Sequence, residues 1–273
     1  MPDVILVEDV APGVSVEVLA AGAGEPVVLL PSASRGAADF AHLQDLLADA
    51  GFRSLAVNPP GVGASTRQAD GATFRESADQ LAGVVDQLGS GRAHFVGHAA
   101  GNIVARGTAS HRPDVVATVS VVPCGGHNLD AYPVAPEVLA ALPRCHDESL
   151  PAAERIAAMQ IAFFAPGNDP SPWLEGWWPG SGFASGLSAD PEEWWAAGTA
   201  PILIMHPRDD AMSPIASGRA SMAAFGERAT YVEIPDCGHA VLPEQPELIA
   251  ANLVAFLRAH PIDADRPEPT RRG

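Results

Sequence analysis

The chain has 273 residues, 47% of them hydrophobic, and a formal net charge of −17. Its 16 basic residues are all arginines, which excludes a Schiff-base lysine and a phosphate-loop lysine. The acidic balance argues against nucleic acid and anionic membranes as partners, because such binding depends on clustered positive charge.

The N-terminal stretch MPDVILVEDVAPG has acidic residues around a short apolar run and lacks the basic start and cleavage site of a signal peptide. No apolar run reaches the roughly 18 residues that span a bilayer. We therefore expect a cytoplasmic protein, monomeric or homodimeric. Cys124, Cys145 and Cys237 stand at wide spacings that suggest neither a disulfide framework nor a zinc site.

The first half of the chain alternates short apolar runs with longer amphipathic segments, a pattern typical of strands and helices around a mostly parallel sheet. The first two runs, DVILVED and VSVEVLA, are typical of an opening hairpin. The pattern predicts strands at 3–9, 14–20, 26–31, 53–59, 93–97 and 115–122, and helices at 37–50, 74–89 and 100–110.

The texture changes between residues 123 and 198, a stretch rich in Pro and Gly that holds all five tryptophans. Alternation then resumes with strands at 201–207 and 229–235 and helices at 216–226 and 246–260. This organisation predicts one α/β core interrupted by a cap, followed by a polar tail that is expected to be flexible. The predicted parts are core 1–124, cap or lid 125–198, core 199–260 and tail 261–273.

Four loops follow predicted strands and carry the residues of interest. The carboxyl ends of parallel strands open on one edge of the sheet, so loops far apart in sequence converge there. The loops are PSASRG (31–36), GHAAG (97–101), HPRDDAMSP (206–214) and IPDCGHAVLPEQPE (234–247).

Taken together and in this order, these segments resemble the α/β-hydrolase superfamily over roughly residues 15–260. NPPGVGAST is similar to the family's Asp-x-x-Gly-x-Gly-x-Ser loop, Gly97 and Gly101 frame an elbow, and a Gly-His pair precedes the last helix. The resemblance implies an α/β-hydrolase fold, with a mostly parallel sheet, helices on both faces and an inserted cap. It implies an esterase-like or lactonase-like enzyme without a cofactor.

The resemblance assigns roles to single positions. Ala99 stands where the family has its nucleophile, and His239 matches the base. Asp210 matches the acid, in preference to its neighbour Asp209. The oxyanion donors would be the backbone N–H groups of Ala33 and Ala100, because backbone donors require no particular side chain.

Three positions depart from the family pattern. Pro31-Ser32 replaces the common His-Gly, Asn58 replaces the usual Asp, and Ala99 replaces a nucleophilic residue. An alanine side chain has no lone pair, so a covalent intermediate cannot form through this position. Ser32 and Ser34 are the nearest hydroxyls, but they lie in the oxyanion loop and not on the elbow.

For several other side chains, a structural role is weighed against a functional one. The tryptophans could form the core of the cap or a lid over a hydrophobic pocket. His98 and His206 are expected to have packing roles, whereas His94, His111 and His127 lack the spacing of metal ligands, so no metal is expected. The predicted substrate-binding residues are Ser32, Trp173, Trp177, Trp178 and Trp194.

Three accounts of Ala99 remain open at this point. The residue could replace the serine of a hydrolase and disable it. It could also belong to an enzyme in which His239 and Asp210 act as a general base, giving a hydrolase, lyase, cyclase or isomerase that acts on a small, largely apolar ester, lactone or related carbonyl compound. The third account is a ligand-binding pseudohydrolase without catalysis.

Overall fold

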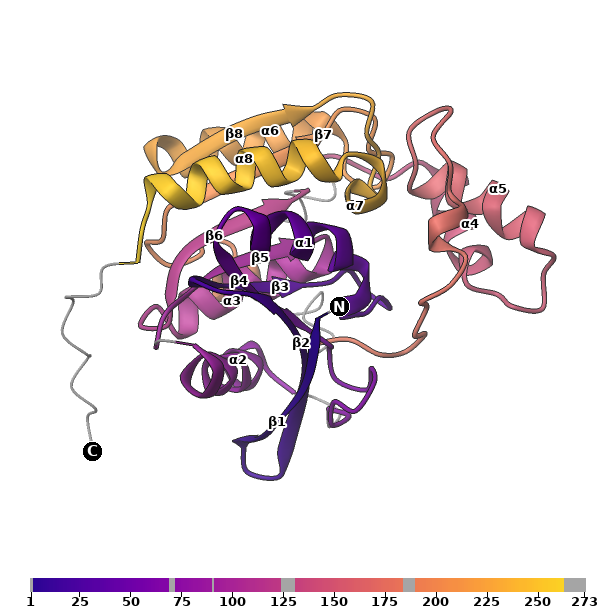
Figure 1. Cartoon of the computed structure of the whole chain (residues 1–273). Helices are drawn as coiled ribbons and strands as arrows, with labels where there is room; N and C mark the ends of the chain where they lie inside the picture. The colour runs from indigo at the N-terminus through magenta and orange to yellow at the C-terminus, as the bar shows by residue number, and fades with distance from the viewer. Residues whose placement is uncertain (1, 69–71, 90, 124–130, 184–189, 263–273) are drawn as a thin grey trace.

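The computed structural model describes residues 2–68, 72–89, 91–123, 131–183 and 190–262. These residues form an eight-stranded sheet in the order β1-β2-β4-β3-β5-β6-β7-β8 (Figure 1). The opening hairpin consists of β1 (Asp3–Ala11) and β2 (Val14–Gly22), which pair antiparallel around Gly13 in the left-handed conformation, φ 72°. Because β2 also pairs antiparallel with β4, the hairpin extends one edge of the sheet.

The remaining strands run parallel and form the centre of the molecule. Most of their residues are buried, as expected for strands covered on both faces. Their bounds are β3 (Glu25–Leu30), β4 (Phe52–Val57), β5 (Ala93–His98), β6 (Val116–Val122), β7 (Ile202–Pro207) and β8 (Ala229–Ile234).

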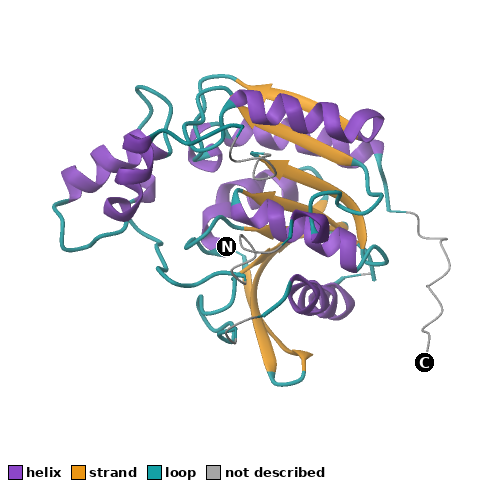
Figure 2. Ribbon diagram, turned by 180° about the vertical axis from the view of Figure 1, so that it is seen from behind, coloured by secondary structure: helices purple, strands orange, loops and turns teal. Residues whose placement is uncertain are grey.

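Helices cover both faces of the sheet (Figure 2). Alternate residues of β3 point to opposite cores: Val27 packs with α1 (Ala41–Asp49) and α8 (Pro246–Ala259), and Val28 packs with α2 (Phe74–Leu88) and α3 (Ala100–His111). The helix α6 (Ile215–Phe225) adds Phe225 to the second core. The short helices η1 (Ala37–Phe40), η5 (Gly226–Arg228) and α7 (Val241–Glu244) complete the connections.

The segment between β6 and β7 stands to one side of the sheet (Figure 1). It contains α4 (Pro136–Cys145), α5 (Ala152–Ala162), η2 (Ser171–Trp173) and η4 (Pro191–Glu193). α4 and α5 share a separate apolar cluster with Trp173, which also reaches Ala240 after β8. The sequence pattern predicts a Pro- and Gly-rich insertion here and assigns no elements within it; in the structure α4 includes Pro143, and α5 starts directly after Pro151.

The predicted fold class is confirmed: the sheet is mostly parallel, with helices on both faces. The ends of the predicted strands and helices agree with the structure to within two residues, except that α1 begins four residues after the predicted start at 37 and η1 occupies the residues between. Within the described ranges, no helix combines the length and apolar character needed to cross a membrane. The predicted tail lies outside the described residues from position 263 onward.

Candidate active site

The connection between β5 and α3 is a strained turn centred on Ala99. Ala99 adopts φ 48° and ψ −113°, a region that side-chain-bearing residues rarely occupy. Its N–H donates to the Val122 carbonyl at 2.8 Å, and its carbonyl accepts from the N–H of Asn102 at 3.0 Å. The backbone therefore has the elbow geometry that exposes a nucleophile, although the residue at its tip has none.

The two glycines of the elbow are required by close backbone contacts. A Cβ at Gly97 would lie 2.3 Å from the backbone N of Asn102, and one at Gly101 would lie 2.2 Å from the Leu30 carbonyl oxygen. Both distances are far below any normal contact. The spacing noted in the sequence thus has a steric cause, since α3 passes directly over β3 and β5.

A cavity of about 840 Å³ opens beside the elbow and is large enough to hold a small organic molecule. Its wall includes Ala99, residues 32–34 of the loop after β3, α4 and one side of α6. Ser213 and Ser217 add hydroxyls to an otherwise largely apolar surface. Among the described residues that line it there is no Asp, Glu, Lys or Arg, so the cavity suits an uncharged ligand.

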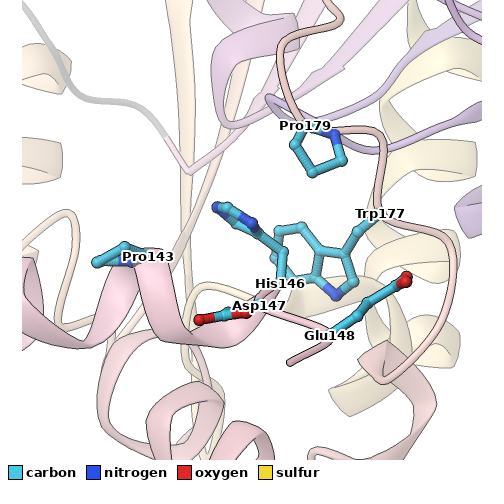
Figure 3. A pocket seen from close by; sticks show the side chains of 6 residues that line it. All are labelled: Pro143, His146, Asp147, Glu148, Trp177 and Pro179. Carbon is cyan, nitrogen blue, oxygen red and sulfur yellow. The ribbon is translucent and has the colours of Figure 1, made fainter. Parts of the chain in front are cut away.

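A second, more open hollow adjoins this cavity (Figure 3). Its volume is about 540 Å³, and its wall includes Asp147, Glu148 and Pro179 from the segment between β6 and β7. Pro143, His146 and Trp177 line both spaces. The two spaces therefore share a wall formed by the C-terminal end of α4 and by Trp177.

Of the four tryptophans predicted to bind substrate, Trp177 lines the cavity and the other three do not. Trp177 and Trp195 line the cavity, whereas Trp173, Trp178 and Trp194 are not among its lining residues. Trp173 and Trp194 are each only 3% exposed and pack in apolar clusters, and Trp178 is 43% exposed. The predicted aromatic wall is therefore corrected to Trp177 and Trp195.

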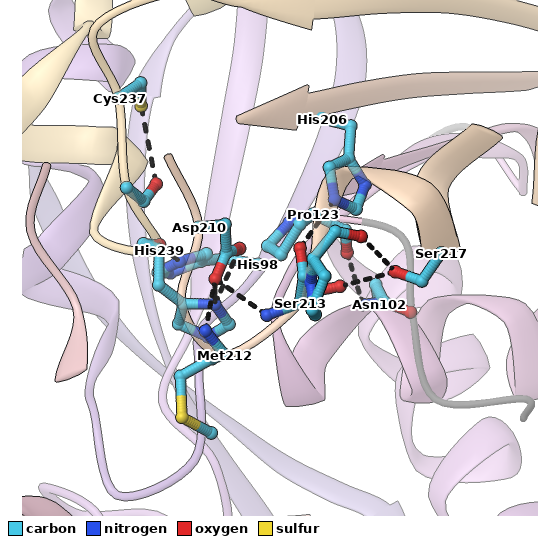
Figure 4. A network of polar contacts seen from close by, with 12 residues as sticks. His98, Asn102, Pro123, His206, Asp210, Met212, Ser213, Ser217, Cys237 and His239 are labelled. Atoms are coloured by element: carbon cyan, nitrogen blue, oxygen red, sulfur yellow. Dashed lines mark hydrogen bonds and ion pairs between the residues drawn. The ribbon is translucent and has the colours of Figure 1, made fainter. Parts of the chain in front are cut away.

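His239 and Asp210 meet at the cavity (Figure 4). Nδ1 of His239 lies 2.9 Å from Oδ2 of Asp210, and both residues are buried. Oδ1 of Asp210 accepts from the N–H groups of Met212 and Ser213, each at 2.8 Å. Because the carboxylate can only accept, Nδ1 carries a proton, and in the neutral imidazole Nε2 is then the nitrogen with the lone pair. Asp209 is exposed, as expected for the residue not chosen as the acid.

Two further histidines hold the backbone of this pair. Nε2 of His98 donates to the carbonyl of His239 at 2.8 Å, and Nε2 of His206 donates to the carbonyl of Ser213 at 2.8 Å. Burial, followed by the nearby imidazole of His239, lowers the pKa of His98 to about 3. Burial also lowers the pKa of His206. Both rings therefore stay neutral and keep their donor N–H at neutral pH.

The predicted oxyanion donors lie at the same cavity. Ala33 and Ala100 line it beside Ala99, and Ala100 is the first residue of α3. Within the described ranges, neither of their N–H groups donates to another residue. Ser32 also lines the cavity, and its carbonyl accepts from the N–H of Arg35. Two free donors, one at a helix start, suit a developing negative charge.

Several cavity residues lie outside the sequence-based set. Asn102 donates through Nδ2 to the Pro123 carbonyl at 2.8 Å and reaches the cavity from the first turn of α3. Tyr132 and Phe163 reach it from the segment between β6 and β7. The sequence could have indicated Asn102, because it follows Ala99 by three residues. No comparable pattern surrounds Tyr132 or Phe163.

No cluster of three or more metal-ligating side chains occurs among the described residues. His94, one of the histidines considered, lies within hydrogen-bonding distance of Thr118 and Glu25. His127 and Cys124 lie outside the described residues.

Comparison with known families agrees with this geometry. A sequence model described as "Alpha/beta hydrolase family" matches residues 27–252. The chain belongs to this family. The resemblance inferred from the four loops is thereby confirmed at the level of the superfamily, and the elbow, acid and histidine positions of this α/β hydrolase all lie within the matched range.

Two curated relatives share part of the sequence. Both are named 2-hydroxy-6-oxononadienedioate/2-hydroxy-6-oxononatrienedioate hydrolase. The Pseudomonas sp. protein is 36% identical over 111 residues, which cover 37% of this chain and 38% of the relative. The Burkholderia vietnamiensis protein is 41% identical over 81 residues, which cover 28% of each chain. The aligned stretches thus span well under half of either relative.

A solved esterase from Thermogutta terrifontis has the same fold. The similarity covers 95% of this chain and 100% of the esterase, with a TM-score of 0.72 and 23% identity. At 23% identity this similarity supports the fold alone, so the reaction is inferred from the residues of the site.

Proposed function

We propose that this α/β hydrolase is an enzyme that uses His239, paired with Asp210, as a general base on a small uncharged carbonyl compound, without a covalent intermediate. One observation carries the proposal. The site has an intact His239–Asp210 pair, but the side chain at the tip of its elbow is the methyl group of Ala99. His239 and Ala99 line the same cavity, and Asp210 leaves Nε2 of His239 free. A water molecule can use the space that a serine hydroxyl would fill.

The hydrolytic reaction follows from these groups. Nε2 of His239 takes a proton from water as the water oxygen bonds to the carbonyl carbon. The carbonyl oxygen becomes an oxyanion that accepts from the N–H groups of Ala33 and Ala100. Collapse of the tetrahedral intermediate breaks the bond to the leaving group, which takes the proton back from His239. Asp210 stabilises the transient imidazolium.

The charge of the cavity narrows the substrate class. The curated relatives are named for dioates, which carry two carboxylates. In this chain the described cavity wall has no Arg or Lys, and burying a carboxylate without a counter-charge is costly. This supports an ester, lactone or other neutral carbonyl compound over a dicarboxylate.

Abstraction of a proton from carbon is the second reaction that the site supports. The same base and the same two N–H donors would stabilise an enolate, giving a lyase, cyclase or isomerase. The absence of a hydroxyl at Ala99 favours this reaction as much as it favours attack by water. Solvent deuterium incorporated at carbon, without incorporation of ¹⁸O from water, would identify it.

The test compares the unaltered protein with His239→Ala and Ala99→Ser. The neutral substrates are aryl esters, lactones and 1,3-diketones, and a carbonyl compound with two carboxylates is the charged counterpart. We expect turnover of a neutral compound by the unaltered protein and its loss in His239→Ala. Turnover only after Ala99→Ser would instead indicate a disabled serine hydrolase. Tight binding without turnover in any variant would indicate a binding protein.

A further inference from the structure

Arg35 lies in the loop after β3, two residues beyond Ala33, and its side chain is almost completely buried. Its Nε donates to Oδ2 of Asp39 at 2.8 Å, and Nη2 donates to Oδ1 at 2.6 Å. This bidentate pairing with Asp39, a residue of η1, fixes the plane of the guanidinium.

The same guanidinium also contacts the segment between β6 and β7. Nη1 donates to the Glu175 carbonyl at 2.8 Å. The guanidinium carbon lies 4.8 Å from the ring centres of both Trp173 and Trp177, within the range of cation–π attraction. A Cβ at Gly176 would lie 3.3 Å from Nη2, so the glycine allows this close approach.

The backbone adds a second link between the same two segments. The N–H of Trp178 donates to the carbonyl of Ser34 at 2.8 Å. Ser34 itself has a positive φ of 57°, which makes this loop conformation dependent on its surroundings. The loop 32–36 and the segment 173–178 therefore hold each other in place through Arg35 and this hydrogen bond.

We propose that Arg35 is a positioning residue that couples the segment 173–178 to the loop 32–36, so that the cavity wall at Trp177 and the N–H of Ala33 are ordered together. Trp177 lines the cavity, and Ala33 supplies an N–H in the proposed reaction. The part that concerns Ala33 rests on the proposed function, whereas the coupling itself does not. Lysine can replace arginine only in part, because an ammonium group cannot donate in a fork to both carboxylate oxygens of Asp39 while it also contacts two indoles.

The coupling is tested by amide hydrogen exchange of the whole chain, which needs no substrate. In Arg35→Met we expect exchange to accelerate on the order of tenfold in peptides from both 32–40 and 171–178, with the central strands unchanged. Arg35→Lys should give an intermediate acceleration in both segments. Acceleration in only one of the two segments would overturn the proposal.

Arg106→Met is the matched control for the loss of a buried arginine. Arg106 is fully buried, and its guanidinium carbon lies 4.4 Å and 4.8 Å from the ring centres of Trp194 and Trp195. This variant should accelerate exchange near α3 and 191–195 and leave 32–40 and 171–178 unchanged. Equal acceleration of those two segments in the control would show that they respond to general destabilisation, and the proposal would be wrong.

Trp177→Leu approaches the coupling from the opposite side and covers the case in which Arg35→Met does not fold. It removes one indole from Arg35 and should accelerate exchange in 32–40, although the substitution itself lies in the other segment. Unchanged exchange there would contradict the proposal.

Kinetics then separate the coupling from the reaction. On a compound turned over by the unaltered protein, Arg35→Met should raise KM and lower kcat, with partial rescue in Arg35→Lys. If His239→Ala has no effect on turnover, the proposed function fails while the exchange result for Arg35 stands on its own.

Discussion

Nδ1 of His239 lies 2.9 Å from Oδ2 of Asp210, and the other carboxylate oxygen is held by two backbone N–H groups. The carboxylate therefore fixes both the orientation and the tautomer of the imidazole. In Asp210→Asn an amide N–H can face Nδ1, which favours the tautomer with its proton on Nε2. We expect kcat/KM to fall by roughly 10³-fold or more, with the circular dichroism spectrum unchanged.

Asp209→Asn is the control for this substitution. Asp209 is the neighbouring carboxylate, but its side chain is exposed, and its N–H donates to the Cys237 carbonyl in either variant. We expect kcat/KM to stay unchanged. A similar loss of activity in both variants would mean that net charge, and not the pairing with His239, controls the rate.

The elbow predicts a change of mechanism in Ala99→Ser. Ala99 already has the strained backbone of a nucleophile position, so the added hydroxyl requires no rearrangement of the main chain. We expect a pre-steady-state burst with aryl esters and an acyl adduct on residue 99, seen by mass spectrometry of the intact protein. The double variant with His239→Ala should show neither. Absence of an adduct in the single variant would contradict the elbow assignment.

The same backbone strain predicts a gain in stability in Ala99→Gly. A residue other than glycine in such a region costs about 1–3 kcal/mol, and glycine returns part of this through its larger entropy in the unfolded chain. We expect the free energy of unfolding to rise by about 1 kcal/mol, measured by urea denaturation. Ala105→Gly, inside α3, should lower it instead, because glycine is unfavourable within a helix.

The sequence was sufficient to predict the residues whose position depends on local pattern. The strands are short apolar runs, and the elbow glycines follow directly from the turn between β5 and α3. The family resemblance assigns Asp210 and His239 as acid and base, and they meet because each follows a strand of the parallel sheet and those strand ends share one edge.

The sequence could not predict which tryptophans reach the cavity. Trp173 is buried against Arg35 and Trp194 against Arg106, and these arginines lie 138 and 88 residues earlier in the chain. No period or spacing links such partners. An arginine between apolar residues is ordinarily read as a surface charge, so the buried guanidiniums emerge only from the tertiary structure.

The buried histidines predict how stability depends on pH. His98 is protonated in the unfolded chain near pH 6.5 but in the folded protein only near its pKa of about 3, because burial disfavours the charged ring. Between these values the unfolded state binds more protons, so the free energy of unfolding falls as pH falls. His98 contributes a slope of up to about 1.4 kcal/mol per pH unit, reached where it is protonated in the unfolded chain and neutral in the folded protein. Burial lowers the pKa of His94 and His206 in the same direction.

His98→Gln isolates one of these contributions. The glutamine Nε2 can still donate to the carbonyl of His239, but it does not titrate. We expect the free energy of unfolding to fall less steeply for the variant between pH 6.5 and 5, where most carboxylates remain ionised in both states. Urea denaturation at several pH values measures the two slopes. Parallel curves would show that His98 binds its proton equally well in the folded and unfolded states, which would contradict the lowered pKa.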